Sequence, residues 1–193
     1  LQNGEVDWWE NPTTDLLPLL RRNANLTIRI HDKTGYFGVL RFNHLTPPFN
    51  NPAIRRAIWW AVDQEDYMTA VAGNDRAMWN SGVGFFATNG PWANDAGMAH
   101  LTSKRDPERA KREIIAAGYK GEKVVVLVPT DVPSLKFAGD VGADMLKRCG
   151  LNVDPLYMDW GSMVQRLGRQ DAADAGGWNV YHTYWSGVDQ LDP

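Results

Sequence analysis

Nine tryptophans are the most distinctive residues in this 193-residue chain that could build a functional site. A tryptophan combines a large apolar face with one N–H donor, which suits a concave site that holds a ligand. Trp160 and Trp185 stand where two expected strands end, and open α/β sheets place their ligand crevices there. Trp59 and Trp60 fall on a strong helical pattern instead, so we expect them in the core or on a surface of that unit. The pattern favours a ligand-binding role for Trp160 and Trp185.

Carboxylates are scattered, and two positions come nearest to a functional cluster. Asp159 stands beside Trp160, and Asp189 lies close to Asp192. A pair of acids could do general acid and base catalysis, which keeps an enzyme domain open as an alternative. Turn formation and helix capping are the commoner roles of aspartates in such local patterns, and we expect those roles here.

Other catalytic and metal-binding signatures are missing from the sequence. The four histidines (31, 44, 100 and 182) have no close metal-ligand spacing. There is no G-x-S-x-G nucleophile elbow, Walker loop or dinucleotide fingerprint. The sequence therefore predicts no catalytic residues, no metal and no cofactor. We expect His182 to be structural and the single cysteine, Cys149, to be a small buried apolar residue.

Composition indicates a folded domain, or one domain and a fraction of another. The chain is 44% apolar and 22% charged. A net charge of -3, with no basic cluster longer than Arg21-Arg22 or Arg55-Arg56, argues against nucleic-acid binding. No apolar run approaches a membrane span or a signal peptide. Because Leu1 to Gly4 resembles the end of a helix, we expect the chain to be a piece of a longer protein.

The first 50 residues contain several short predicted elements. The pattern favours a short strand over Gly4–Trp9 and a half-buried strand over Leu26–Ile30. A further strand over Tyr36–Phe42 follows a turn signal. Thr14 is expected to cap a short helix over residues 15–22.

The next 50 residues hold the clearest helix. Asn51 is a good N-cap, with proline at the first helical position after it. Asp63 is expected to cap a second helix that closes at Gly73. Residues 74–100 have no period and are rich in aromatics, Trp92 among them. A loop this long in a compact domain is usually functional.

The second half of the chain alternates between helices and strands. We predict strands at Val124–Val128, Leu151–Met158 and Trp178–Tyr184. We predict one helix over 106–118, a second helix that includes Ala138 and ends at Gly150, and a third helix over 160–169. Val124–Val128 is apolar throughout, as expected of a strand buried on both faces. Alternating elements of this kind imply an α/β fold with a largely parallel sheet and right-handed crossovers.

A family resemblance enters at the clearest helix. The run from Pro47 to Asp63 resembles the signature helix of the extracellular solute-binding protein family 5, which includes oligopeptide- and dipeptide-binding proteins. Phe42-Asn43, Pro48-Phe49, Arg56-Ala57 and Val62-Asp63 follow the family's pattern in order.

Other stretches resemble the same family in the same order along nearly the whole chain. They are Gly4-Glu5-Val6-Asp7, Asp106 to Lys111 with Ala117-Gly118-Tyr119, Leu146 to Val153, Asp159-Trp160, and Trp185 to Pro193. No single one of these motifs is specific, whereas several of them in sequence are.

The resemblance implies one lobe of a class II periplasmic-binding-protein fold, with a mixed, mostly parallel sheet flanked by helices. Residues 1–42 would be the end of the first lobe with a crossing strand, and 43–193 most of the second lobe. The implied function is the substrate-binding component of an ABC importer. Such a protein would work in the periplasm, hold a peptide or similar small solute between two lobes and deliver it to a membrane permease.

The resemblance also implies the ligand-binding residues, which are Trp160, Trp185, Asp189, Tyr184 and Trp92. In peptide-binding relatives an aspartate shortly after the cleft tryptophan pairs with the α-amino group of the ligand. Asp189 is the nearest match, one residue later than usual, with Val188 in the usual place. We expect Trp160, Trp185 and Asp189 to cluster around one concavity. An enzyme using Asp159 or Asp189, and a sensor module on the same fold, stay open as alternatives.

Overall fold

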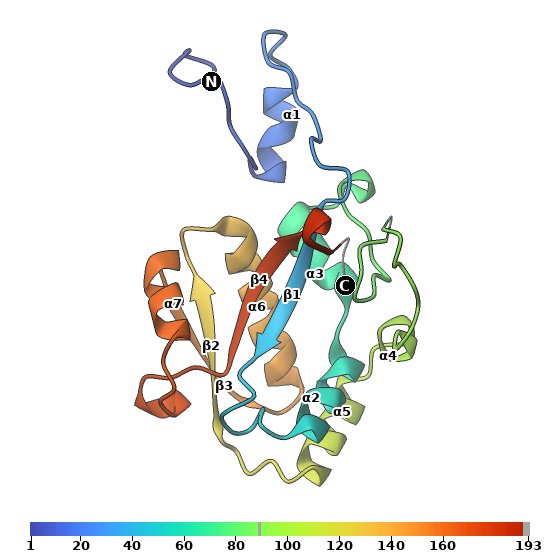
Figure 1. Ribbon diagram of the computed structural model, residues 1–193, viewed down its shortest axis with the longest axis vertical. Coiled ribbons are helices and arrows are strands. Elements are labelled where there is room, and N and C mark those ends of the chain that lie inside the picture. Colours follow the sequence, from blue (N-terminus) through green and yellow to red (C-terminus); the bar gives the residue numbers. More distant parts are fainter. Residues whose placement is uncertain (89, 191–193) are drawn as a thin grey trace.

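The computed structural model describes residues 1–88 and 90–190. An N-terminal arm, residues 1–35, carries one short helix and leads into an α/β unit (Figure 1). The α-helices are α1 (Leu17–Leu20), α2 (Pro52–Ile58), α3 (Gln64–Ala72), α4 (Ala99–Thr102), α5 (Pro107–Ala116), α6 (Pro133–Arg148) and α7 (Trp160–Leu167). The strands are β1 (Tyr36–Phe42), β2 (Lys123–Pro129), β3 (Asn152–Met158) and β4 (Val180–Ser186). Single 3-10 turns are η1 (Thr14–Leu16), η2 (Trp59–Ala61), η3 (Arg76–Met78), η4 (Ala173–Ala175) and η5 (Gly187–Gln190).

The four strands form one mixed sheet in the order β1-β4-β2-β3. β2 runs parallel to both β3 and β4, while β1 is antiparallel to β4. The α/β class and the three predicted strands of the second half are therefore confirmed. β4 begins at Val180, two residues later than predicted, because Asn179 uses its side chain and backbone to join other segments.

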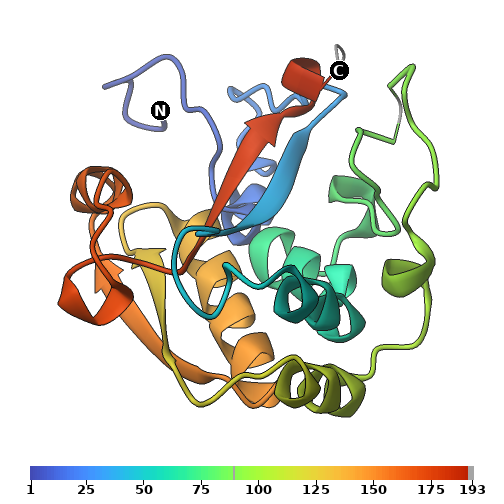
Figure 2. The ribbon, with the colours of Figure 1, turned by 60° about the horizontal axis from the view of Figure 1, so that its bottom comes forward.

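β2 is the centre of the core, as its unbroken apolar run predicts. Its residues alternate between two apolar clusters, one on each face of the sheet. Val124, Val126 and Val128 pack with α2, α5 and α6, whereas Val125 and Leu127 pack with Met163 of α7 and with η4. Figure 2 shows these two groups of helices on opposite sides of β2.

Helix caps, two of them predicted, explain where α2, α3 and α5 begin. Asn51 accepts a hydrogen bond from the backbone N–H of Ala53, and its amide reaches the carbonyl of Ala117 on α5. Asp63 accepts from the backbone of Glu65 at 2.9 Å. The Asp106 side chain caps α5 in the same way. Satisfying these orphan N–H groups fixes the start of each helix.

Three expectations for the arm are wrong. Gly4–Trp9 and Leu26–Ile30 form no strand, because the sheet contains no neighbour that pairs with either segment. The helix predicted over residues 15–22 is instead the 3-10 turn η1 followed by the single turn α1. Its predicted cap is also wrong, since Thr13 takes the N-cap position without a side-chain hydrogen bond.

Asn179 joins three separate segments inside the protein. Its side-chain oxygen accepts from Val125 N at 2.8 Å, and its amide nitrogen donates to the Pro47 carbonyl at 2.9 Å. Its own carbonyl accepts from Asn43 N at 2.7 Å. The side chain is fully buried, so each of these bonds replaces a bond to water.

We predict that Asn179→Ala lowers the free energy of unfolding by about 3 kcal/mol, because it leaves buried backbone groups without partners. Urea denaturation of the two proteins measures the change. Asn25→Ala, at an exposed position in the arm, is the matched control and should stay within about 0.5 kcal/mol. Similar losses in both variants would contradict the central role of Asn179.

His182 is a buried, neutral histidine in β4. Its Nε2 lies 3.3 Å from the Tyr67 hydroxyl of α3, and Gly142 of α6 lies directly against the ring. Its Nδ1 has no hydrogen-bond partner among the described residues. Burial lowers the pKa of His182 to about 4. The expected structural role of this histidine is confirmed.

This burial predicts an acid-sensitive fold. The unfolded histidine binds a proton near pH 6.5, while the folded one resists protonation until about pH 4. Stability should therefore be unaffected above pH 6.5 and fall by about 1.4 kcal/mol per pH unit between these two values. Urea midpoints from pH 7 to pH 4.5 test this. His182→Gln should flatten the slope, whereas the exposed control His31→Gln should leave it unchanged. An equally steep slope in His182→Gln would assign the acid sensitivity to other groups.

Candidate functional site

The carboxyl ends of β2, β3 and β4 carry three residues that are far apart in sequence, Asp131, Trp160 and Trp185. In the parallel register Leu127 of β2 pairs with Leu156 of β3 and with Tyr181 of β4. Asp131, Trp160 and Trp185 each stand four residues beyond that level. The predicted pair of tryptophans thus lies at the same edge of the sheet, with the end of β2 between them.

Trp160 begins α7 and is half buried against the apolar cluster of Val125, Leu127 and Met163. Its backbone N–H donates to Asp131 Oδ1 at 2.8 Å, which ties the start of α7 to the end of β2. Trp160 is therefore a fixed part of the edge.

Asp159 caps α7. Its carboxylate accepts from the backbone and hydroxyl of Ser162 at 2.9 and 2.6 Å, and these bonds lower the pKa of Asp159. The capping role expected from the sequence is confirmed. A carboxylate held in its charged form by a cap is poorly suited to accept a proton at neutral pH.

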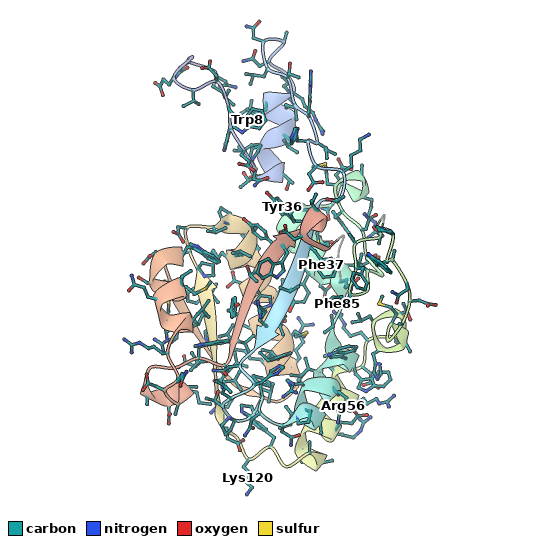
Figure 3. The ribbon with its side chains drawn as sticks, in the orientation of Figure 1. Trp8, Tyr36, Phe37, Arg56, Phe85 and Lys120 are labelled. Carbon is teal, nitrogen blue, oxygen red and sulfur yellow. The ribbon has the colours of Figure 1, made fainter. Side chains whose placement is uncertain are left out.

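Tyr184, Trp185 and Asp189 lie on one continuous segment at the end of β4. Trp185 pairs with Phe37 of β1 and is 44% exposed. The Tyr184 ring packs on Tyr36 with centroids 4.7 Å apart. Asp189 lies in the 3-10 turn η5 and is exposed, while Asp192 lies outside the described residues. Figure 3 shows Tyr36 and Phe37 at the end of β1 that faces the arm.

Trp92 lies apart from this segment in the sequence, in the long connection between α3 and α5. It is 48% exposed, and Phe85 of the same connection is 75% exposed and stacks edge-on with Phe86. In its described residues, 74–88 and 90–100, the predicted loop contains the 3-10 turn η3 and the start of the short helix α4. In Figure 1 this connection lies to the right of β1 and β4, on the side of α3 and α4.

Trp59 and Trp60 lie away from the edge, as expected. Trp59 is 42% exposed at the end of α2, and Trp60 stacks between Arg109, 3.5 Å from its ring centre, and His100. Both tryptophans contact α4 through His100, and Trp60 also contacts α5 through Arg109.

Two polar residues of this region were not singled out from the sequence. Asp131 follows β2 by two residues, so the rule that places ligand sites after parallel strands could have found it. Asp32 precedes β1 and bonds Ser186 at the end of β4, 154 residues away. Only the folded chain reveals the contact between Asp32 and Ser186.

Aromatic rings and carboxylates occur at two places on this edge. Asp131 and Asp159 are exposed next to Trp160, and Asp189 is exposed four residues after Trp185. Such a surface can attract a cationic or amine-bearing ligand and pack its apolar parts on the rings.

Within residues 1–88 and 90–190, no three His, Cys, Asp or Glu side chains are placed to hold a metal ion. Cys149 is buried, and burial raises the pKa of its thiol to about 12. None of the helices in the described part of the chain is long and apolar enough to cross a membrane.

Comparison with known proteins gives a consistent result over the whole sequence. The profile of the family described as "Bacterial extracellular solute-binding proteins, family 5 Middle" matches residues 1–193. A curated relative from Sinorhizobium fredii, named as a probable peptide ABC transporter periplasmic-binding protein, is 36% identical over 183 residues. That alignment covers 95% of this chain and 34% of the relative, so the chain spans about a third of the relative's length.

Solved structures share the fold. The periplasmic binding protein DppA from Helicobacter pylori, in complex with the peptide STSA, has a TM-score of 0.76 and 22% identity. The alignment covers 100% of this chain and 35% of the Helicobacter pylori protein. The binding protein AgaA from A. tumefaciens R10, in complex with agropinic acid, has a TM-score of 0.65 and 19% identity, covering 89% and 33%. At these identities the similarity establishes the fold alone, and it confirms the class II periplasmic-binding-protein architecture.

Proposed function

The chain belongs to the bacterial extracellular solute-binding proteins of family 5, and from that membership we propose that it forms one wall of a peptide-binding cleft. The observation that carries the proposal is the shared level of Trp160 and Trp185 at the carboxyl edge of the sheet, with Asp189 just beyond. Open α/β sheets bind ligands in this place.

A peptide is the ligand class that the relatives favour. The curated relative is named for peptide transport, and the Helicobacter pylori protein was solved with a peptide. The same fold holds agropinic acid in another relative, so fold alone does not choose the ligand. The choice has to come from side chains on this edge.

Asp189 is the side chain that we assign to the peptide's amino group. An ammonium group that leaves water needs an anionic partner, or its burial costs several kcal/mol. Asp189 is exposed at the end of the segment that carries Trp185, so a ligand amine can approach it. Trp160, Trp185, Tyr184 and Trp92 would then pack on the ligand's side chains.

The family also suggests how this chain would be divided between the two lobes of the whole protein. Residues 1–42 would close the first lobe and supply a crossing strand, and 43–193 would form most of the second lobe, including residues outside the described part. The whole protein would work in the periplasm and deliver its solute to the permease of an ABC importer. The arm lies beyond the carboxyl end of β4, on the side where the first lobe would cover the ligand (Figure 1).

The alternatives receive less support. The family and the curated relative are solute-binding proteins, which gives no support to an enzyme using Asp159 or Asp189. Asp159 is also engaged as a helix cap. A sensor module on the same fold would bind its ligand in the same place. It would differ in failing to restore uptake when supplied to a strain that lacks its own binding protein.

We predict that Asp189→Asn in the full protein weakens binding of the peptide STSA about 10- to 100-fold, which corresponds to about 1.5–3 kcal/mol for a charged hydrogen bond. Calorimetry measures the affinity. The N-acetylated peptide should bind poorly to the unaltered protein and be almost insensitive to the substitution.

Asp174→Asn is the matched control, because Asp174 is an exposed aspartate in η4, before the amino end of β4. It should leave the affinity unchanged. Equal affinities of Asp189→Asn and the unaltered protein for the free peptide would remove Asp189 from the site.

We also predict that the isolated 193-residue chain binds the peptide only weakly, with a Kd of about 1 mM, or about -4 kcal/mol. A single wall leaves one side of the ligand in water, whereas closure of two lobes strengthens each polar contact. Titration of the isolated chain and the full protein with the same peptide measures the difference. Equal affinities would show that the site is complete within this chain.

A further inference from the structure

A turn before β1 is fastened to the end of β4. The two ends meet because β1 and β4 are antiparallel, so the first residue of β1, Tyr36, pairs with the last residue of β4, Ser186. Beyond Tyr181, β4 pairs with β1 alone among the described strands. From His182 to Ser186 the two strands β1 and β4 therefore project from the rest of the sheet as a two-stranded ribbon (Figure 2).

Asp32 makes the polar contact between the two ends. Its Oδ1 accepts from the backbone N–H of Thr34 at 2.8 Å and from the Thr34 hydroxyl at 2.5 Å. Its Oδ2 accepts from the Ser186 hydroxyl at 3.1 Å. These bonds, those from Thr34 first, lower the pKa of Asp32 and keep it charged at neutral pH.

The contact continues into the ligand-binding segment. The Ser186 oxygen accepts from the backbone N–H of Val188 at 3.3 Å, and Gly187 N donates to the Gly35 carbonyl at 2.7 Å. Gly187 is packed so closely that an added Cβ would lie 2.6 Å from the Thr34 carbonyl oxygen. With the Ser186 proton directed to Asp32, a lone pair of the same oxygen is left for Val188.

We propose that Asp32 is a positioning residue for ligand binding, acting through Ser186 to hold the backbone at 187–188 and so to aim Asp189. The inference rests on the proposed function, because Asp189 is assigned to the ligand there. Asp32 itself touches no ligand in this scheme. It fixes the direction in which the end of the ribbon projects, and preorganisation of this kind strengthens binding by reducing the ordering that the ligand must cause.

An aspartate is required by this geometry. Its two oxygens accept three hydrogen bonds from donors on two segments. An asparagine has one oxygen and a donating nitrogen. In Asp32→Asn either Thr34 or Ser186 would therefore face a second donor, and the Ser186 hydroxyl would lose its charged acceptor.

The experiment compares four forms of the full protein, namely the unaltered protein, Asp32→Asn, Ser186→Ala and the double variant. Calorimetry and stopped-flow measurements give the affinity and the dissociation rate for the peptide STSA. We expect each single variant to bind about 5- to 10-fold more weakly, mainly through faster dissociation. The double variant should bind no more weakly than the weaker single variant, because both substitutions break one connection. Asp15→Asn, at an exposed aspartate of the same arm, should change nothing.

Hydrogen exchange in the absence of peptide is the second measurement. The amides of Gly187 and Val188 should exchange faster in Asp32→Asn, while those of β2 keep their protection. A lower Tm with unchanged peptide affinity would make Asp32 merely structural and overturn the inference. Additive losses in the double variant, or unchanged exchange at 187–188, would overturn it as well.

These outcomes separate the inference from the proposed function. Faster exchange at 187–188 with unchanged affinity would overturn the positioning role and leave the peptide cleft intact. An affinity that responds to Asp32→Asn but not to Asp189→Asn would overturn both the amine contact and the positioning role, because Asp32 is proposed to act by aiming Asp189. Absence of peptide binding by the unaltered full protein would overturn both.

Discussion

The fold depends on the buried side chain of Asn179, which lies where the chain enters β4. One amide group bonds β2 through Val125 and the loop after β1 through Pro47, while the adjoining backbone bonds Asn43. This arrangement lets an antiparallel strand, β1, join a parallel pair without leaving buried backbone groups unpaired. In the order β1-β4-β2-β3, the strand that follows Asn179 lies between β1 and β2, the neighbours that Asn179 helps to join.

From Asn179 onward, β4 passes through two environments. Its first residues pair with β2 and are buried in the core, and His182 is enclosed between α3 and α6. Among the described strands, its last residues pair with β1 alone, and they include Tyr184 and Trp185. A rigid base and an exposed tip on one strand are a suitable arrangement for a ligand-binding segment, because the core holds the strand while its tip stays accessible.

Preorganisation connects the arm to the proposed cleft. Trp160 is fixed by Asp131 and by the apolar cluster under α7, so one side of the edge is set by the core. Asp189 is exposed in η5, and in the proposed scheme its direction depends on the hydrogen bonds of Asp32 and Ser186. The two sides of the edge are therefore held by different means. The Trp160 side is held by the core, and the Asp189 side is held by the turn of Asp32, which connects the arm to β1.

The sequence by itself determined the elements whose causes are local. The caps at Asn51 and Asp63, the apolar run of β2 and the alternation of strands and helices were sufficient for the α/β class and for placing Trp160 and Trp185 at strand ends. Tertiary structure decided which strands pair, so the alternating segment Leu26–Ile30 formed no strand without a neighbour. It also decided the contacts of Asn179 and of Asp32, since a hydrogen bond across more than a hundred residues leaves no local pattern.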